Sequence, residues 1–534
     1  MNANELPQKN PVPVTPAEQR SEPTTSAPDK HNDSEGKLTG YKVASYFKET
    51  HLSPEQLDPA SYEKGSRNRL RTIPDNSDSA TILNKTIKVA TFNASLSRES
   101  TSTDTTGFDV LKSQMAVSHE KQESLIKQYN VNDGSLDSKN KKLAKHIRQI
   151  KNIAEIIQRT TPDILVLAEF DNNGVADDTQ AIDDFQTNYL SYPQNETLTA
   201  VNYPYRKTIP TNTGKPSGLD LNNDGKTDGP GDAWGYGSFH GQYAYAIFSK
   251  YPFDETGYRS FQNFKWKDMR DHDEQVPVIL PSKDKRNLNA IKKMNKEIGD
   301  SWYSHQAWEH MPLSSKNHID LPVLIPVTHG STHPLHLLVS HPAPPIQDPF
   351  AAQNRLRNQA EIGFWTDYIS GKPYFLDDND RKRALDKNAD FIIVGDLNSD
   401  PVVGDKYVTA TKTLLDSVHV NTTATTGTHI PTSKGGADHL DSLSEKKKRS
   451  GGKRQEKSGD TSCVTSVSRF RLDYVIPSAG LMVQDSGVFW PSKDEPGQHL
   501  VDIPQRGNVK DVSSDHRLVW VDIDIPKERT ERNR

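Results

Sequence analysis

The sequence is poor in cysteine and in large apolar side chains, and each shortage excludes a class of protein. Cys463 is the one cysteine among 534 residues, so no intrachain disulfide can form and a small disulfide-bonded scaffold is excluded. Only 33% of the residues are hydrophobic, which indicates that part of so long a chain lies outside any core. No run approaches the roughly 18 apolar residues of a membrane-spanning helix, so no transmembrane segment is expected.

A strong excess of one charge is also missing. The formal net charge is −5, which gives no overall attraction to nucleic acid, although local basic patches are compatible with it. Residues 1–7 have neither a basic start nor an apolar segment, so no cleavable secretory signal is expected in this numbering. The location therefore stays open between the cytoplasm and export by a non-classical route.

Composition divides the chain into four parts. Residues 1–35 are rich in Pro, Ser, Thr, Glu and Gln with almost no large apolar residue, which predicts a disordered polar leader. Residues 36–84 form an N-terminal extension, and residues 527–534 form a charged tail. Between them, residues 85–526 are predicted to form one folded domain that carries two long insertions. These insertions cover about 254–320 and 419–465.

The spacing of apolar residues predicts both helices and strands within 85–526. Apolar residues recur at helical spacing in Lys142–Arg159 and again in Asn354–Tyr368, and each helix is followed by a buried strand. Further strands are expected at Tyr243–Ser249, Leu335–Ser340, Asp473–Ile476 and Leu518–Ile523. This mixture predicts an α/β (α+β) body in which sheets are buried under helices.

Five short segments join an apolar, strand-like run to polar side chains suited to catalysis. They are Lys88–Asn93, Ile164–Glu169, Ile392–Asn398, Arg471–Ile476 and Ser514–His516. A carboxylate where a buried strand emerges is costly unless it is paired or binds a metal. Hard oxygen ligands suit Mg²⁺, and a histidine with a near-neutral pKa suits a general base. Together the segments predict a divalent-metal-dependent enzyme that hydrolyses phosphate esters.

Individual roles follow from these positions. Glu169 ends an apolar run and is a candidate metal ligand. Asp396 and Asn398 are two residues apart, so both side chains would point to one side if the strand continued through them. His516 is the candidate general base, and Asp473 is the best candidate for the carboxylate that orients it.

The segments resemble those of the endonuclease/exonuclease/phosphatase superfamily, over roughly residues 85–526. This resemblance implies the deoxyribonuclease I-like fold: a four-layer sandwich of two mostly antiparallel sheets flanked by helices, with the active site at one rim. It also implies a catalytic domain at 85–526 and Mg²⁺ or Mn²⁺ as cofactor. The implied metal-site residues are Asn93, Glu169 and Asp515. The implied catalytic residues are His516, Asp473, His341, Asp396 and Asn398.

The middle of the chain is similar to a bacterial branch of this superfamily that has no fixed substrate. The resemblance there lies in Asp228–Gly237, Gly241–Pro252 and His341–Pro345. A nuclease is slightly favoured, because Arg471–Tyr474 resembles the apurinic-site endonucleases. A phosphatase or phosphodiesterase of a small-molecule or lipid phosphate is the alternative, and a non-catalytic or delivered effector that keeps the fold is the second. The expected partner is a phosphate-ester substrate, with nucleic acid as one option, and no protein partner is predicted.

A second cation site is a further hypothesis. Asp220, Asn222, Asp224 and Asp228 match the first oxygen positions of a Ca²⁺-binding loop, with Gly225 at its sixth position. The twelfth position is glycine rather than glutamate and no flanking helices are evident, which favours a polar, glycine-rich turn instead. Residues 446–454 carry a basic run that could contact nucleic-acid phosphates, but no aromatic residues are interleaved with it for base stacking.

Overall fold

The computed structural model describes residues 85–131, 134, 136–269, 276–327, 330–402, 409–449, 460–504 and 508–526. The expected leader at 1–35, the extension at 36–84 and the charged tail at 527–534 lie outside these residues. The side chains of the basic run at 446–454 lie outside them as well. Within the part that is described, no helix is long and apolar enough to cross a membrane.

Eleven strands in the described ranges form two sheets, and both sheets are mostly antiparallel. The six-stranded sheet has the order β10-β11-β1-β2-β4-β3, and its one parallel pair is β1 with β2. Its strands are β1 (Lys85–Asn93), β2 (Ile164–Ala168), β3 (Tyr205–Thr208), β4 (Tyr245–Ser249), β10 (Met482–Val488) and β11 (Val519–Ile525). The five-stranded sheet has the order β5-β6-β7-β8-β9, and its one parallel pair is β7 with β8. Its strands are β5 (Arg259–Ser260), β6 (Ile319–Pro326), β7 (Thr332–Val339), β8 (Asp390–Asp396) and β9 (Asp473–Pro477).

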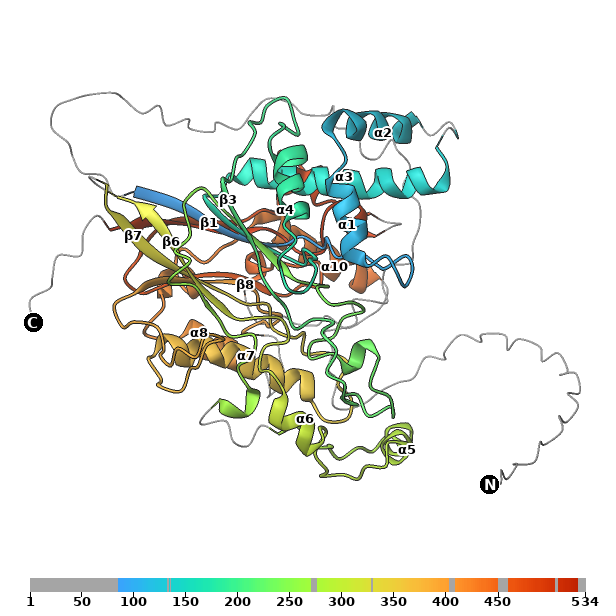
Figure 1. Ribbon diagram of the computed structural model, residues 1–534. Coiled ribbons are helices and arrows are strands. Elements are labelled where there is room, and N and C mark those ends of the chain that lie inside the picture. Colours follow the sequence, from blue (N-terminus) through green and yellow to red (C-terminus); the bar gives the residue numbers. More distant parts are fainter. Residues whose placement is uncertain are drawn as a thin grey trace, which may run out of the picture. The chain divides into compact units, whose positions relative to one another are not determined.

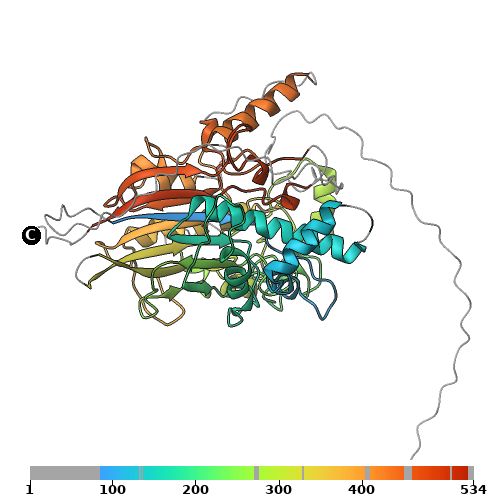
Figure 2. The ribbon, with the colours of Figure 1, turned by 90° about the horizontal axis from the view of Figure 1, so that it is seen from above.

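Helices cover the outer faces of the two sheets, which completes the four layers (Figures 1 and 2). The helices beside the six-stranded sheet are α1 (Gly107–Met115), α2 (His119–Val131), α3 (Ser138–Thr160) and α4 (Gln180–Phe185). Those beside the five-stranded sheet are α7 (Gln353–Ile369) and α8 (Ala410–Leu415). The remaining α-helices are α5 (Lys285–Lys293), α6 (His305–His310), α9 (Thr422–Thr425) and α10 (Lys434–Arg449). The expected deoxyribonuclease I-like sandwich of two sheets flanked by helices is confirmed.

Short 3₁₀ and π segments lie between these elements. They are η2 (Gln186–Leu190), η3 (Pro230–Asp232), η4 (Trp266–Asp268), η5 (Thr461–Cys463), η6 (Gln498–Leu500) and η7 (Val509–Asp511).

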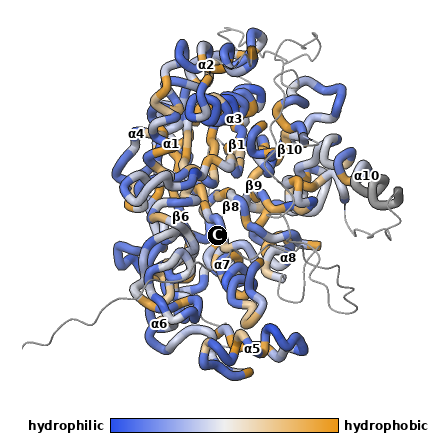
Figure 3. Tube along the Cα trace, turned by 90° about the vertical axis from the view of Figure 1, so that its right-hand side faces the viewer, coloured by the Kyte–Doolittle hydropathy of each residue, from blue (hydrophilic) through white to orange (hydrophobic). Residues whose placement is uncertain are grey.

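Helix α3 shows how the sequence sets one of the layers. Its isoleucines, among them Ile147 and Ile150, are fully buried in a large hydrophobic cluster. The same cluster fills the space between the two sheets. The helix begins before the expected start, because the Asp137 carboxylate caps it by accepting a hydrogen bond from the Asn140 backbone N–H at 2.7 Å. It ends at Thr161, which takes a left-handed conformation with φ 47°. The apolar residues lie mainly on the strands between the helical layers (Figure 3).

The insertion at 254–320 is integrated into the second sheet and its helical layer. It supplies β5 and the first residues of β6. Trp266 and Trp302 are buried in the same hydrophobic cluster as Trp365 of α7. The buried guanidinium of Arg259 pairs with Asp377 at 2.8 Å. The tryptophans of this segment therefore serve the packing of the second layer.

The ends of several strands meet at one rim of the sandwich. Asn93, the last residue of β1, is paired in register with Ala168, the last residue of β2. In the other sheet, Asp396 at the end of β8 is paired with Asp473 at the start of β9. Gly395 has φ 146°, and a Cβ there would lie 2.0 Å from the Ser340 carbonyl oxygen, so only glycine fits the approach of this strand to Ser340. The rim thus brings polar strand ends from both sheets together.

Candidate active site

A histidine and an aspartate form the centre of the site. The Nδ1 atom of His516 is 2.9 Å from Oδ2 of Asp473, and the same oxygen accepts a hydrogen bond from the Thr465 hydroxyl at 2.7 Å. A carboxylate only accepts, so Nδ1 carries a ring hydrogen, and in the neutral form of the ring Nε2 has the lone pair. The backbone N–H of His516 donates to the Ser514 hydroxyl at 3.0 Å, and this hydrogen bond fixes the backbone of His516. The arrangement has the parts of an oriented general base, as the sequence predicts.

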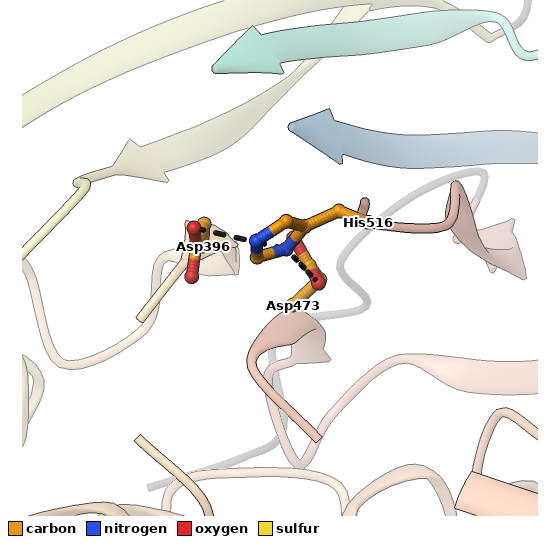
Figure 4. A group of neighbouring side chains, drawn as sticks. All are labelled: Asp396, Asp473 and His516. Atoms are coloured by element: carbon orange, nitrogen blue, oxygen red, sulfur yellow. Dashed lines mark hydrogen bonds and ion pairs between the residues drawn. The ribbon is translucent and has the colours of Figure 1, made fainter. Parts of the chain in front are cut away.

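A second carboxylate lies on the other side of the ring. Figure 4 shows His516 between Asp473 and Asp396. Oδ2 of Asp396 is 3.8 Å from Nδ1 of His516 and 3.5 Å from Nε2 of His341. The same oxygen accepts a hydrogen bond from the Asn93 amide at 3.0 Å. The structure therefore brings Asp396, Asp473, His516, Asn93 and His341 together, all of them buried.

Burial and charge set the protonation of this group. Burial raises the pKa of Asp396 to about 6, although the nearby His516 opposes the shift. Burial alone would lower the pKa of His516, but the carboxylates of Asp473 and Asp396 raise it to about 10, so that at physiological pH the ring also holds a proton at Nε2. Burial lowers the pKa of His341, and the positive charge of Lys316 lowers it further. His341 is consequently a neutral imidazole at physiological pH, able to donate one hydrogen bond.

The carboxylates assigned to a metal lie beside this group and are held by other side chains. Glu169 directly follows β2, and its Oε1 accepts a hydrogen bond from the Asn93 amide at 3.1 Å. Asp515 accepts a hydrogen bond from the Ser95 hydroxyl at 2.7 Å. The Asn93 side-chain oxygen accepts from the Ser95 backbone N–H at 3.1 Å, so the amide nitrogen must face the carboxylates. In this orientation Asn93 holds Glu169 and Asp396 in place through its nitrogen.

Four residues around the site take left-handed backbone conformations that L-amino acids seldom adopt. They are Ser95 (φ 49°), Glu169 (φ 56°), Tyr243 (φ 56°) and Asn398 (φ 52°). Such conformations typically cost about 1–3 kcal/mol each and concentrate at functional sites. Their grouping at the rim is independent of the motif argument, and it supports the same location for the site.

Asn398 departs from the expected strand geometry. Strand β8 ends at Asp396, so the two side chains do not continue the alternation of a strand. Instead the Asn398 backbone N–H donates to Oδ1 of Asp396 at 2.9 Å, and its side-chain amide donates to the Pro342 carbonyl at 3.1 Å. The left-handed turn, and not strand alternation, places Asn398 beside the segment that carries His341.

The donor set fits a hard divalent cation. Glu169 and Asp515 offer carboxylate oxygens, which suit Mg²⁺, Mn²⁺ or Ca²⁺. Although burial opposes ionisation, the charges of Lys510 and His516 hold the pKa of Asp515 well below its ordinary value, so it is ionised as a metal ligand must be. Asp396, Asp473 and His516 also bring three donor atoms within 4.8 Å of one another. Asp473 and His516 are already joined by a direct hydrogen bond, and Thr465 donates to the same carboxylate, so Glu169 and Asp515 stay the predicted metal ligands.

The predicted Ca²⁺ loop has the hydrogen bonding of a turn. The Asp220 carboxylate accepts from the backbone N–H groups of Asp224 and Gly225 at 3.1 and 2.9 Å, and the Asn222 side chain accepts from Asp224 at 2.8 Å. Among the described residues, Asp220, Asp224 and Asp228 do not converge as a group of three ligand atoms. The geometry favours the glycine-rich turn, and Ca²⁺ binding at this loop stays a prediction.

Sequence reasoning missed Lys316, a buried cation at the site. Its side chain is 6% exposed, and its ammonium lies 3.5 Å from the Pro342 carbonyl oxygen. Burial lowers its pKa, and the carboxylates of Glu361, Asp396 and Glu169 oppose that shift. The one local signal is a lysine between small polar residues just before an apolar strand. Because single lysines usually lie on surfaces, this signal does not distinguish Lys316.

The fold and the site define a hydrolase that acts on phosphate esters. The chain belongs to the Endonuclease/Exonuclease/phosphatase family, whose model matches residues 128–516. No curated protein matches the sequence.

Solved structures with which the chain can be aligned are all distant. An endonuclease/exonuclease/phosphatase from Beutenbergia cavernae is 14% identical with a TM-score of 0.36, and the match covers 82% of this chain and 72% of that one. A family protein from Leptotrichia buccalis is 11% identical with a TM-score of 0.34, covering 82% of this chain and 100% of that one. A mannosyl-6-phosphatase from Bacteroides thetaiotaomicron is 11% identical with a TM-score of 0.31, with coverage of 82% and 100%.

Proposed function

We propose that this protein is a divalent-metal-dependent phosphoesterase in which His516 takes the proton of the attacking water. The hydrogen-bonded series Thr465–Asp473–His516 carries this proposal, because it fixes the ring through Nδ1 and leaves Nε2 for proton transfer at the rim. Nε2 accepts a proton once the ring has lost its second one, which the positive charge of a cation held by Glu169 and Asp515 would favour. Asp473 orients the ring and stabilises the imidazolium that forms. The water's proton moves to Nε2 while its oxygen bonds to phosphorus, and the ester P–O bond breaks. The alkoxide that leaves takes up a proton from the imidazolium or from solvent.

The other residues prepare the phosphate for attack. Glu169 and Asp515 would hold Mg²⁺ or Mn²⁺, which would withdraw charge from the phosphoryl oxygens. Asn398 and the neutral His341 would donate hydrogen bonds to the negative charge that builds up in the transition state. Asn93 donates to both Glu169 and Asp396. It would therefore hold the carboxylate assigned to the metal at a fixed position relative to the carboxylate beside His516.

Two substrate classes compete for this site. Cleavage of a phosphodiester, as in a nuclease, is our first hypothesis, and hydrolysis of a small-molecule or lipid phosphate is the second. Arg471, which belongs to the segment that favoured a nuclease, is buried and donates to the Thr425 carbonyl at 2.9 Å. Arg471 thus supports the fold and does not itself recognise a nucleic acid. The choice between the two classes depends on direct measurement.

Hydrolysis of a substrate panel tests the proposal. The panel holds plasmid DNA, RNA, bis-p-nitrophenyl phosphate, p-nitrophenyl phosphate, inositol polyphosphates and sphingomyelin, each with Mg²⁺, Mn²⁺, Ca²⁺ or EDTA. We expect a diester to be cleaved with Mg²⁺ or Mn²⁺ and not with EDTA, and the same cleavage to be absent from His516→Ala. Cleavage that persists in EDTA would contradict the metal requirement. Hydrolysis of monoesters alone would favour the second substrate class.

Replacement of Lys316 by methionine is expected to lower kcat by about 10²- to 10³-fold, the usual effect of losing one group that stabilises transition-state charge. The ammonium is buried beside His341 and near Asp396, where it adds positive charge to the phosphate site. Steady-state hydrolysis of the substrate found in the panel measures the effect. Lys265→Met is the matched control, because this half-exposed lysine of the same segment donates to the His310 carbonyl. A normal kcat in Lys316→Met would leave Lys316 with a packing role only.

A further inference from the structure

Lys510 lies against one of the carboxylates that we assign to the metal, and the proposed mechanism gives it no task. Its ammonium is 3.3 Å from Oδ1 of Asp515, the same oxygen that accepts the Ser95 hydroxyl at 2.7 Å. The Lys510 side chain is 41% exposed, whereas that of Asp515 is 15% exposed. The partly exposed ammonium of Lys510 thus pairs with the mostly buried carboxylate of Asp515.

Both metal-site carboxylates act on this ammonium. Burial opposes its charge, but Asp515 and Glu169 raise the pKa of Lys510 above its ordinary value. The phenol of Tyr243, which lies near enough to Glu169 to feel its charge, acts on Lys510 in the same direction. The ammonium of Lys510, 3.3 Å from Asp515, therefore compensates the negative charge of this carboxylate.

The backbone of Lys510 lies in an anchored turn, and its side chain is partly exposed to solvent. Lys510 is the middle residue of η7, whose first residue, Val509, is fully buried. The next residue, Asp511, pairs with Lys145 of α3 at 2.7 Å, and the Val512 carbonyl accepts from Asn152 at 2.8 Å. A lysine stem on such a fixed base can swing its ammonium to solvent at low cost, because the stem is flexible and the head is easily hydrated.

We propose that Lys510 is a built-in counter-ion of the metal site, which a divalent cation displaces from Asp515 when it binds. The inference rests on the proposed metal site at Glu169 and Asp515. A divalent cation at those carboxylates would lie close to the ammonium, and like charges held together are strongly unfavourable. Without metal, the positive charge of Lys510 compensates the negative charge of the two carboxylates, so that their repulsion does not destabilise the rim. With metal, its ammonium leaves Asp515. Breaking this ion pair offsets part of the favourable free energy of metal binding.

Titration of the full chain with Mn²⁺, followed by calorimetry, tests the inference. We expect Lys510→Met to bind Mn²⁺ at least about tenfold more tightly than the wild type, because an unfavourable like-charge contact is removed. Lys510→Arg should stay near the wild-type affinity, because the charge is kept. Lys145→Met is the matched control: it removes a cation that pairs with Asp511 of the same turn and not with a carboxylate assigned to the metal, so its Mn²⁺ affinity should not change.

The outcomes separate this inference from the proposed function. Wild-type binding that is lost in Glu169→Ala supports the metal site itself, whatever the lysine variants do. An unchanged or weaker affinity in Lys510→Met would then overturn the role of Lys510 alone. If the wild type binds no Mn²⁺, binding by Lys510→Met would support the inference, and no binding would overturn both. Lys510→Gln serves the same comparison if the methionine variant does not fold, and thermal unfolding without metal checks that the variants are folded.

Discussion

Replacement of His516 by alanine is expected to lower kcat by about 10²- to 10⁴-fold, the range for loss of a positioned acid–base group. The ring is hydrogen-bonded through Nδ1 to the buried carboxylate of Asp473, and its Nε2 is the atom that exchanges the proton in the proposed reaction. Its loss leaves the binding groups in place, so KM should change much less than kcat. Steady-state rates on the substrate identified in the panel, together with thermal unfolding of the variant, measure both effects.

The chain contains a matched control for this substitution. His336, in the interior of β7, forms another histidine–carboxylate pair, with its Nδ1 2.6 Å from Oδ1 of Asp320. His336→Ala removes a similar pair within the sheet and should leave kcat unchanged, even if the protein becomes less stable. A turnover of His516→Ala close to that of the wild type would remove His516 from the mechanism.

Asp473 gives an independent check on the same unit. Asp473→Ala should lower kcat by removing the acceptor that fixes the tautomer of His516. Combined with His516→Ala, it should add little further loss, because residues that act as one unit are not additive. Fully additive losses in the double variant would show that the two side chains contribute separately.

The parts of this site that follow strands could be predicted from sequence. Each predicted segment has an apolar run whose length fixes where the chain leaves the core, and the polar residue comes directly after it. Glu169 follows β2, and Asp396 ends β8 beside Asp473. The local pattern thus contains the information for their positions, because the apolar run and the polar residue at its end lie within the same few residues.

Other parts depend on contacts between distant segments, and the local sequence gives no sign of them. Lys316 is a single lysine without a distinguishing pattern, and only the meeting of the two sheets brings it near Glu169. The turn at Asn398 depends on the Pro342 carbonyl, 56 residues away along the chain. The integration of 254–320 into the second layer likewise rests on packing against α7, which no local periodicity reveals.

Burial of His318 is expected to make the stability of the protein fall in acid. Its Nε2 donates to the Glu361 carbonyl at 2.8 Å, while its Nδ1 is buried without a partner, and the rings of Phe364 and Trp365 lie 4.7 and 5.0 Å away. Burial lowers the pKa of His318 to about 3, although the hydrogen bond to the carbonyl opposes the shift. The unfolded chain, with an ordinary histidine pKa of about 6.5, therefore takes up a proton before the folded protein does.

This contribution to stability is fully present above about pH 6.5 and is lost as the pH falls toward 3, at about 1.4 kcal/mol for each pH unit. His318→Gln can still donate to the Glu361 carbonyl but has no titration in this range. Between pH 7.5 and 4.5 in EDTA, urea unfolding should therefore show a free-energy loss about 2–3 kcal/mol larger for the wild type than for His318→Gln. His305→Gln, at an exposed histidine of α6, should keep the wild-type dependence. Identical pH dependence in wild type and His318→Gln would contradict the burial of a neutral imidazole, because the linkage requires the proton uptake on unfolding to differ by one site.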